Sequence, residues 1–224
     1  MVETLPLFPL GTVLFPGLLL PLHVFEERYR VLVRELVDLP TGTPRRFGVV
    51  AIRQGREVGE DGITALHDYG CAAELRRVEA YEDGRYDIVT TGTTRFRLHE
   101  LDRRGPYLRG AVDLLPEVIG EEAEASLLVG MVQRAFGTYL ATLGQVRGEE
   151  IEAPDLPADP LVLSYLVAAT VVVDLDAKQA LLSEPDARSR LRAEVSLLKS
   201  EVSMLRTLTA APAPDLRAMP FSLN

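Results

Sequence analysis

Residues 5–22, LPLFPLGTVLFPGLLLPL, constrain the fold more than any other part of the chain, because they are apolar, uncharged and interrupted by prolines. A run of this length would just allow a membrane-spanning helix. However, Pro9 and Pro16 lie inside the run, with Gly11 and Gly17 close to them. Each interior proline removes a helical hydrogen bond and costs roughly 3 kcal/mol in a helix. The pattern therefore excludes a continuous helix, and we expect no membrane span.

We expect the segment to form two extended pieces, over residues 5–15 and 18–22, with Phe15-Pro16-Gly17 as the turn between them. Proline is tolerated in strands only at edges, ends and bulges. The two pieces should therefore lie at the margin of a sheet or the rim of a barrel. A secretory signal would need basic residues before its apolar core, whereas the first basic residue here is Arg28.

The composition limits the compartment and the partners. The apolar share of 47% and the charged share of 25% are typical of a globular protein. Cys71 is the only cysteine, which excludes an internal disulfide and suits the reducing cytoplasm. The formal net charge of −9 disfavours a nucleic-acid binder that is held by phosphate contacts.

The first half of the chain combines one helical pattern with several strand patterns. Residues 24–37 carry apolar side chains at spacings of four, three and four, which predicts an amphipathic helix with a buried stripe of Phe25, Tyr29, Leu32, Val33 and Leu36. Strand patterns follow at residues 47–53, 71–81, 86–101 and 107–117. A charged loop at 55–62 separates the first two, and a hairpin turn at Asp83-Gly84 joins the second and the third. Gly92 marks a bulge or a sharp corner. These elements predict a strongly bent sheet or an open barrel.

Beyond Glu117 the apolar spacing becomes helical. Asp159-Pro160 predicts an N-cap and first turn, and Ser183-Glu184-Pro185-Asp186 resembles a capping box. The predicted helices cover residues 121–143, 159–173, 176–183 and 183–208. In the last of them a heptad seam covers only about two heptads, so packing within the chain is favoured over a dimer seam. Its members are Leu191, Val195, Leu198, Val202 and Leu205.

The predicted fold class is therefore α+β. We expect a β-rich subdomain over residues 1–117 with one helix near 24–37, a helical subdomain over 118–208, and a flexible tail over 209–224. The expected oligomeric state is a monomer or a weak dimer.

The sequence contains no recognised catalytic, cofactor-binding or metal-binding motif. A phosphate-binding loop needs a lysine after a glycine-rich turn, but the only lysines, Lys178 and Lys199, lie in predicted helices. His67 and Cys71 have the spacing of half a metal site, without a second pair of ligands. A buried, unreactive thiol is the favoured interpretation of Cys71, because a nucleophilic cysteine needs an activating base.

The opening stretch LPLFPLGTVLFPGLLLPLHVFEERYRVLV, residues 5–33, closely resembles the start of the Lon substrate-binding (amino-terminal) domain family. FGVV at 47–50, TTGTTRFRL at 90–98 and KQALLSEPDARSRLRAEVSLL at 178–198 are also similar to that family. The resemblance covers roughly residues 3–208. It implies a PUA-like bent β-barrel or pseudo-barrel, followed by a helical bundle.

The resemblance also implies a function. In the full protease this domain helps to recognise protein substrates, while separate domains hydrolyse ATP and cleave peptides. The chain is similar to stand-alone bacterial members, so we expect a non-catalytic protein- or peptide-binding module linked to protein quality control. The expected partners are polypeptide segments, with no cofactor, nucleic acid or membrane. For the protein-binding surface we predict Phe15, Pro16, Leu18, Phe25 and Tyr29, the first three as exposed residues.

Two alternatives stay open. One is a hydrolase with an unrecognised site between the two halves, for which the candidate residues are His67, Asp68, Cys71 and His99. The other is RNA binding, because PUA-like barrels can bind RNA. The negative net charge and the lack of a basic patch with interleaved aromatic residues disfavour the second alternative.

Overall fold

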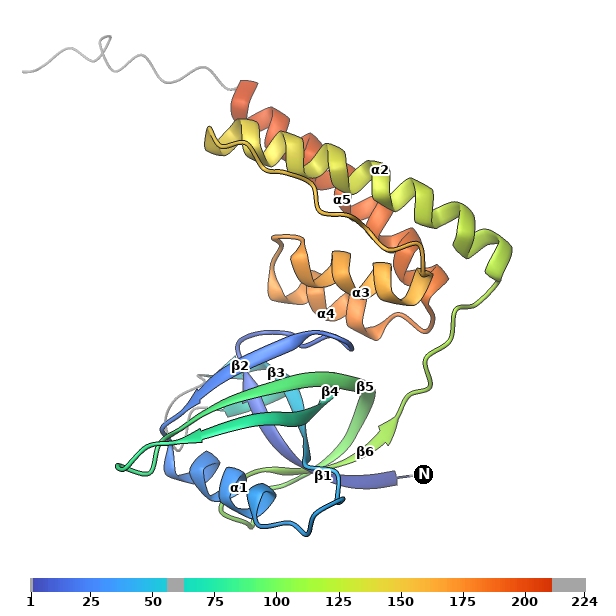
Figure 1. Cartoon of the computed structure of the whole chain (residues 1–224). Coiled ribbons are helices and arrows are strands. Elements are labelled where there is room, and N and C mark those ends of the chain that lie inside the picture. Colours follow the sequence, from blue (N-terminus) through green and yellow to red (C-terminus); the bar gives the residue numbers. More distant parts are fainter. Residues whose placement is uncertain (1, 56–62, 211–224) are drawn as a thin grey trace, which may run out of the picture.

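The computed structural model describes residues 2–55 and 63–210, apart from the side chains of residues 63–64 and 208–210. The predicted loop at 55–62 and tail at 209–224 therefore fall almost wholly outside the described residues. The chain is α+β, as predicted, and Figure 1 shows the strands and α1 in one half and the other helices in a second half packed against it. The elements are, in order, β1 Val2–Leu10, β2 Leu19–Val24, α1 Glu27–Val37, β3 Arg46–Gly55, β4 Ile63–Ala80, β5 Tyr86–Asp102, β6 Arg109–Leu114, α2 Glu122–Arg147, α3 Pro160–Thr170, α4 Leu175–Ser183 and α5 Ala187–Ala210.

The strands form one sheet in the order β2-β5-β4-β3-β1-β6, and β6 also pairs with β5. That second pairing of β6 closes a ring from β5 through β4, β3, β1 and β6, with β2 attached along β5. Among the described strand pairs, β1 and β3 alone run parallel. The ring agrees with the bent β-barrel that the family resemblance implies, and it is more closed than the open barrel that the strand pattern alone predicts. Closing the ring pairs strand edges that would otherwise stay free.

The proline-rich segment forms β1 and β2 with a turn between them, as predicted. β2 lies at the edge of the sheet, but β1 lies between β3 and β6, so the marginal position predicted for both pieces is wrong for β1. Residues 2–6 register with β6 and residues 7–10 register with β3. Each part of β1 therefore has a registered partner strand on one side only. On the other side a proline, which has no N–H to donate, removes no hydrogen bond of the sheet.

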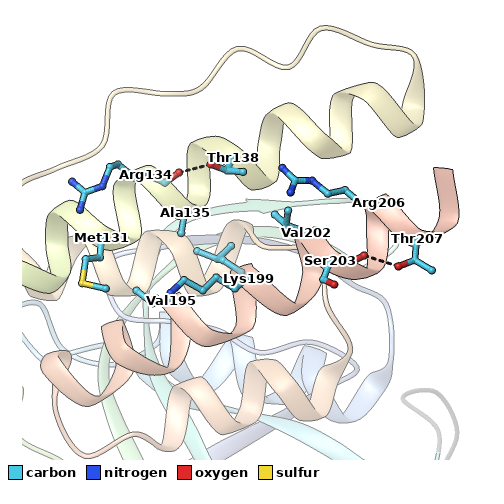
Figure 2. Close-up of a pocket in the computed structure, with 11 residues that line it drawn as sticks. Met131, Arg134, Ala135, Thr138, Val195, Lys199, Val202, Ser203, Arg206 and Thr207 are labelled. Carbon is cyan, nitrogen blue, oxygen red and sulfur yellow. Dashed lines mark hydrogen bonds between the residues drawn. The ribbon is translucent and has the colours of Figure 1, made fainter. Parts of the chain in front are cut away.

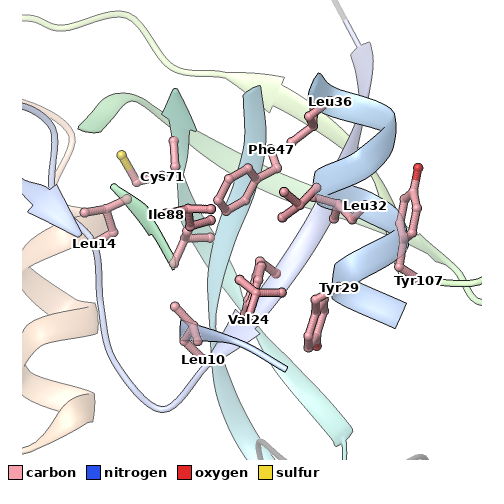
Figure 3. Packing of buried hydrophobic residues seen from close by; sticks show 14 residues of the cluster. Leu10, Leu14, Val24, Tyr29, Leu32, Leu36, Phe47, Cys71, Ile88 and Tyr107 are labelled. Carbon is pink, nitrogen blue, oxygen red and sulfur yellow. The ribbon is translucent and has the colours of Figure 1, made fainter. Parts of the chain in front are cut away.

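α1 covers the barrel core with the predicted apolar stripe. Tyr29, Leu32, Val33 and Leu36 are buried, and Figure 3 shows the helix packing onto residues of the strands. The ring of Tyr29 stacks on Phe8 with 4.0 Å between the ring centroids. Phe25, which was also expected in the stripe, precedes the helix and is 50% exposed. The stripe is therefore shorter than predicted, because the backbone is still extended at the residue before the helix.

Gly92 in β5 allows another part of the chain to cross very close to the sheet. The Gly17 N–H donates to the Gly92 carbonyl oxygen at 2.9 Å, and the Gly92 N–H donates to the Leu18 carbonyl oxygen at 2.9 Å. A Cβ at Gly92 would overlap the carbonyl oxygen of Phe15. The register with β4 also shifts beside Gly92, as the predicted bulge requires. The glycine is needed because the turn between β1 and β2 lies directly on β5.

Three helix boundaries differ from the prediction, each for a local reason. α2 continues through Gly144 to Arg147, and it is Gly148, with φ of 70°, that takes the left-handed conformation at the helix end. α3 ends at Thr170 rather than at residue 173, because the backbone leaves the helical conformation at Val171, where ψ is 134°. α5 begins at Ala187, because the Asp186 carboxylate, rather than Ser183, accepts a hydrogen bond from the Ser189 N–H at 2.7 Å.

Two buried arginines, one from each half, bind the C-terminal end of α4. Arg95 of β5 is 1% exposed, and its Nη1 donates to the carbonyl oxygens of Leu182 at 2.9 Å and Glu184 at 2.5 Å. Arg190 of α5 donates from Nε to the carbonyl oxygen of Leu181 at 2.9 Å. The last carbonyls of a helix have no intrahelical donor and lie at the negative end of its dipole. The two guanidinium groups satisfy them and join α4 to the barrel.

A buried carboxyl lies one turn beyond Arg190. Glu194 is 1% exposed, and neither of its carboxyl oxygens has a hydrogen-bond partner among the described residues. Burial raises the pKa of Glu194 well above its usual value, and the positive charge of Arg190 acts in the opposite direction. The carboxyl therefore keeps its proton in the folded protein at pH values where the unfolded chain has lost it.

Gly92→Ala should lower the free energy of unfolding by about 1–3 kcal/mol, because the new methyl group overlaps a backbone oxygen that cannot move freely. Gly137→Ala is the matched control, since a Cβ there meets no atom within 4 Å and lies inside α2. Alanine at that helical position should stabilise the protein by roughly 0.5–1 kcal/mol. Urea unfolding of both variants measures the two changes, and a shift in the same direction for both would contradict this account.

Glu194→Gln should change how stability depends on pH. The folded-state pKa of Glu194 is raised, so between the unfolded and folded pKa values the folded state binds the extra proton and stability falls as the pH rises. The neutral glutamine removes this loss. The variant should therefore gain stability over the native protein as the pH rises above the unfolded pKa. Urea unfolding over a pH series gives the difference, and a constant difference at all pH values would refute it.

Candidate functional site

A groove with a volume of about 790 Å³ lies between α2 and α5. Its apolar part is formed by Met131, Ala135, Val195, Leu198 and Val202. Figure 2 shows side chains from both helices lining it. Met131 is 39% exposed, so the groove presents apolar surface to solvent. An open apolar surface bordered by polar side chains is typical of a binding site.

The rim of this groove is polar and basic. Arg134 comes from α2, and Lys199 and Arg206 come from α5. The remaining lining residues are Thr138, Ser203 and Thr207. In the described part of the chain no acidic side chain lines the groove, although the formal net charge of the whole sequence is −9. The groove therefore differs in charge from the molecule that carries it.

The groove exists because α2 and α5 lie side by side and run in the same direction (Figure 1). Near their starts, Glu124 of α2 pairs with Arg188 and Arg192 of α5. The predicted seam of α5 packs against the other helices, as expected, and its first four residues are buried. The basic rim of the groove is a feature that the apolar periodicity of the sequence does not predict. The sequence does carry one sign of the basic rim. α2 contains no acidic residue after Glu124, so Arg134 in the middle of that helix has no carboxylate near it on the same helix.

The residues predicted as a protein-binding surface do not form one surface. Phe15 is 1% exposed and packs against Tyr165 of α3, with 6.3 Å between the ring centroids. Pro16 is also buried, and Leu18 is half-buried. The predicted exposure of Phe15 and Pro16 is therefore wrong, because the helical half covers the turn that contains them.

Phe25 and Tyr29 lie together at a different place on the barrel. Tyr29 is 3% exposed, whereas the ring of Phe25 reaches solvent. They line a hollow of about 210 Å³, whose other lining residues are Phe8, Leu10, Leu22, His23, Val24 and Glu26. Of the predicted surface residues, Phe25 is thus the most accessible, next to the edge strand β2.

The hydrolase candidates His67 and Asp68 line a cleft of about 270 Å³ between β4 and α4. His67 Nε2 lies 3.8 Å from a carboxylate oxygen of Asp176. Ser183 also lines the cleft, but its hydroxyl donates to the carbonyl oxygen of Ala180. In the described residues no hydrogen bond joins His67 Nε2 to a nucleophile, although serine hydrolysis requires such a bond between nucleophile and base.

The other two hydrolase candidates have different surroundings. His99 pairs with Asp113 of β6 at 2.9 Å. Cys71 is completely buried in the barrel core, and this burial raises the pKa of its thiol. A thiol in this setting stays protonated and is a poor nucleophile. The structure thus brings His67 and Asp68 into one cleft, but it places Cys71 inside the core.

The described residues also bear on metal binding and on membranes. Their His, Cys, Asp and Glu side chains include no group of three or more that could hold a metal ion. None of their helices combines the length and the apolar character that crossing a bilayer requires.

Comparison with known proteins connects this geometry to a family. A family model described as the ATP-dependent protease La (LON) substrate-binding domain matches residues 4–200. Lon protease 2 of Myxococcus xanthus is 27% identical over 206 residues, which are 91% of this chain and 24% of that protein. Lon protease of Escherichia coli K12 is 23% identical over 203 residues, which are 90% of this chain and 25% of that protein. The chain thus spans about a quarter of the length of these relatives.

Two solved structures are similar. The crystal structure of a Lon N-terminal domain protein from Xanthomonas campestris has a TM-score of 0.59 and 26% identity, and the match covers 87% of this chain and 98% of that chain. The N-terminal domain of a Mycobacterium avium complex Lon protease also has a TM-score of 0.59, with 18% identity over 90% of this chain and 98% of that chain. The second shows likeness of fold alone. The resemblance seen in the sequence is confirmed, and the chain belongs to the LON substrate-binding domain family.

Proposed function

We propose that this chain recognises polypeptide segments that expose apolar side chains, and that it binds them in the groove between α2 and α5. The observation that carries the proposal is the groove itself, with an apolar lining that reaches solvent at Met131 and a polar rim, in a member of a substrate-binding domain family. Removing apolar surface from water contributes roughly 25 cal/mol per Å². A few side chains placed in the groove therefore suffice for weak, reversible binding.

The proposed role is non-catalytic and serves protein quality control in the cytoplasm. The matching family model is that of the substrate-binding domain, and the proposal is restricted to that role, without ATP hydrolysis or peptide cleavage. The single cysteine supports a reducing compartment. The accessible ring of Phe25 and the hollow beside it remain a second candidate contact for the same partner.

Ser203→Trp should weaken binding of a fluorescein-labelled apolar peptide by about tenfold or more, because the indole would fill the groove from an exposed position on its rim. Leu127→Trp is the matched control, since Leu127 is 73% exposed on α2 and does not line the groove. Fluorescence anisotropy titration measures both affinities.

The control should change the affinity by less than about twofold, since it adds the same apolar ring outside the site. A chemically unfolded, alkylated polypeptide should compete with the labelled peptide. Equal affinities of the native protein and both variants would place binding elsewhere, and the same titration with Phe25→Ala would then test the second contact.

A further inference from the structure

The charge of the groove limits which polypeptides it can hold. Its rim carries Arg134, Lys199 and Arg206, and no acidic residue lines it in the part of the chain that the structure describes. Arg134 and Lys199 form no ion pair with another described side chain. By contrast, the nearby arginines Arg188 and Arg192 are both paired with Glu124. Arg134 and Lys199, which have no ion pair among the described side chains, therefore attract an anionic partner to the groove.

The negative net charge of the molecule does not cancel this attraction. Charges in solution are screened over roughly 8–10 Å at physiological ionic strength. α2 has no acidic residue from Ala125 to Arg147, and Glu194 on α5 is buried with a raised pKa. Glu201, the other acidic residue of α5, does not line the groove. A partner in the groove therefore meets the basic rim directly.

The spacing of the cations matches a helical partner. Lys199 and Arg206 are seven residues apart, and Ser203 lies between them on the same stripe of α5. At 1.5 Å per residue, seven residues span about 10 Å of a helix. A partner helix that lies along the groove places side chains at i and i+7 at the same interval, with apolar residues at i+3 and i+4 directed at the floor.

Among the described residues, α2 and α5 alone line the groove. α3 packs against α2 and α5 through Leu163 and Val167, but every residue that lines the groove belongs to α2 or α5. Arginine binds a carboxylate through two parallel N–H donors. The arginines of the rim therefore select the planar shape of a carboxylate as well as its negative charge.

We propose that the groove selects amphipathic helical segments whose apolar stripe is flanked by acidic side chains two turns apart. This inference rests on the proposed function, and it names the class of polypeptide that the site takes. A basic segment is disfavoured because its charges would face Arg134, Lys199 and Arg206. Binding should also weaken as the salt concentration rises, because the attraction is screened.

Three fluorescein-labelled peptides test the proposal. They share one length and one set of helix-forming apolar residues, and they carry Glu, Gln or Lys at the two flanking positions. Anisotropy titration of the native protein should give an affinity for the Glu peptide about tenfold higher than for the Lys peptide, with the Gln peptide between them. The double variant Arg134→Glu, Lys199→Glu should reverse this order, because it reverses the charge of the rim.

The control is the double variant Arg77→Glu, Arg104→Glu, which changes the net charge by the same amount at exposed barrel positions. It should keep the native order of the three peptides. Circular dichroism and thermal melting confirm that each variant folds. The order of the three affinities for the native protein tests the charge selection even if a variant fails to fold.

The two proposals fail in different ways. If none of the three peptides binds the native protein, the proposed function fails at this groove. If all three bind with equal affinity, polypeptide binding holds and the charge selection is overturned. A preference for the Lys peptide would overturn it as well. Equal loss of selectivity in the groove variant and in the barrel control would show that overall charge, rather than the rim, decides the affinity.

Discussion

The end of α4 is the point on which the arrangement of the whole molecule depends. Its last carbonyl groups would lie buried without donors, and Arg95 from the barrel and Arg190 from α5 supply them. Arg190 also donates to Ser164 and lies 4.1 Å from the ring centroid of Tyr165, so α3 joins the same network. Breaking one buried charge contact leaves the others uncompensated, which makes such a network costly to disrupt. The barrel and the helices are therefore held at one junction by charge and hydrogen bonding, with apolar packing of Phe15 beside it.

This junction also explains why the two candidate surfaces lie where they do. The helical half uses α3 and α4 to meet the barrel, which leaves α2 and α5 on its far side with the basic groove between them (Figure 1). At the other end of the molecule, α1 covers the barrel and leaves Phe25 at its border. α2 and α5 do not contribute the main contacts to the barrel. A partner can therefore bind in the groove without disturbing the core of the barrel.

The periodicity of the sequence predicts most elements, since α1, the strands and the four later helices each carry a clear pattern of apolar residues. It cannot predict which apolar residues of the proline-rich segment are covered, because Phe15 is buried by Tyr165, which lies far along the chain. Arg95 is missed for a related reason. Arginines are rarely buried, and this one is buried only because a helix end from the other half reaches it. The groove is equally invisible in the sequence, since the residues of its floor show the same spacing as core residues.

The pairing of the first strand has a consequence for synthesis on the ribosome. β1 leaves the ribosome before both of its partners, β3 and β6, and β6 ends at Leu114. At the usual rates of translation, on the order of ten seconds pass before β6 follows. During that interval the uncharged opening segment has no completed ring to enter, and it resembles the apolar segments that chaperones bind. Until β6 is made, the ring that buries β1 cannot close.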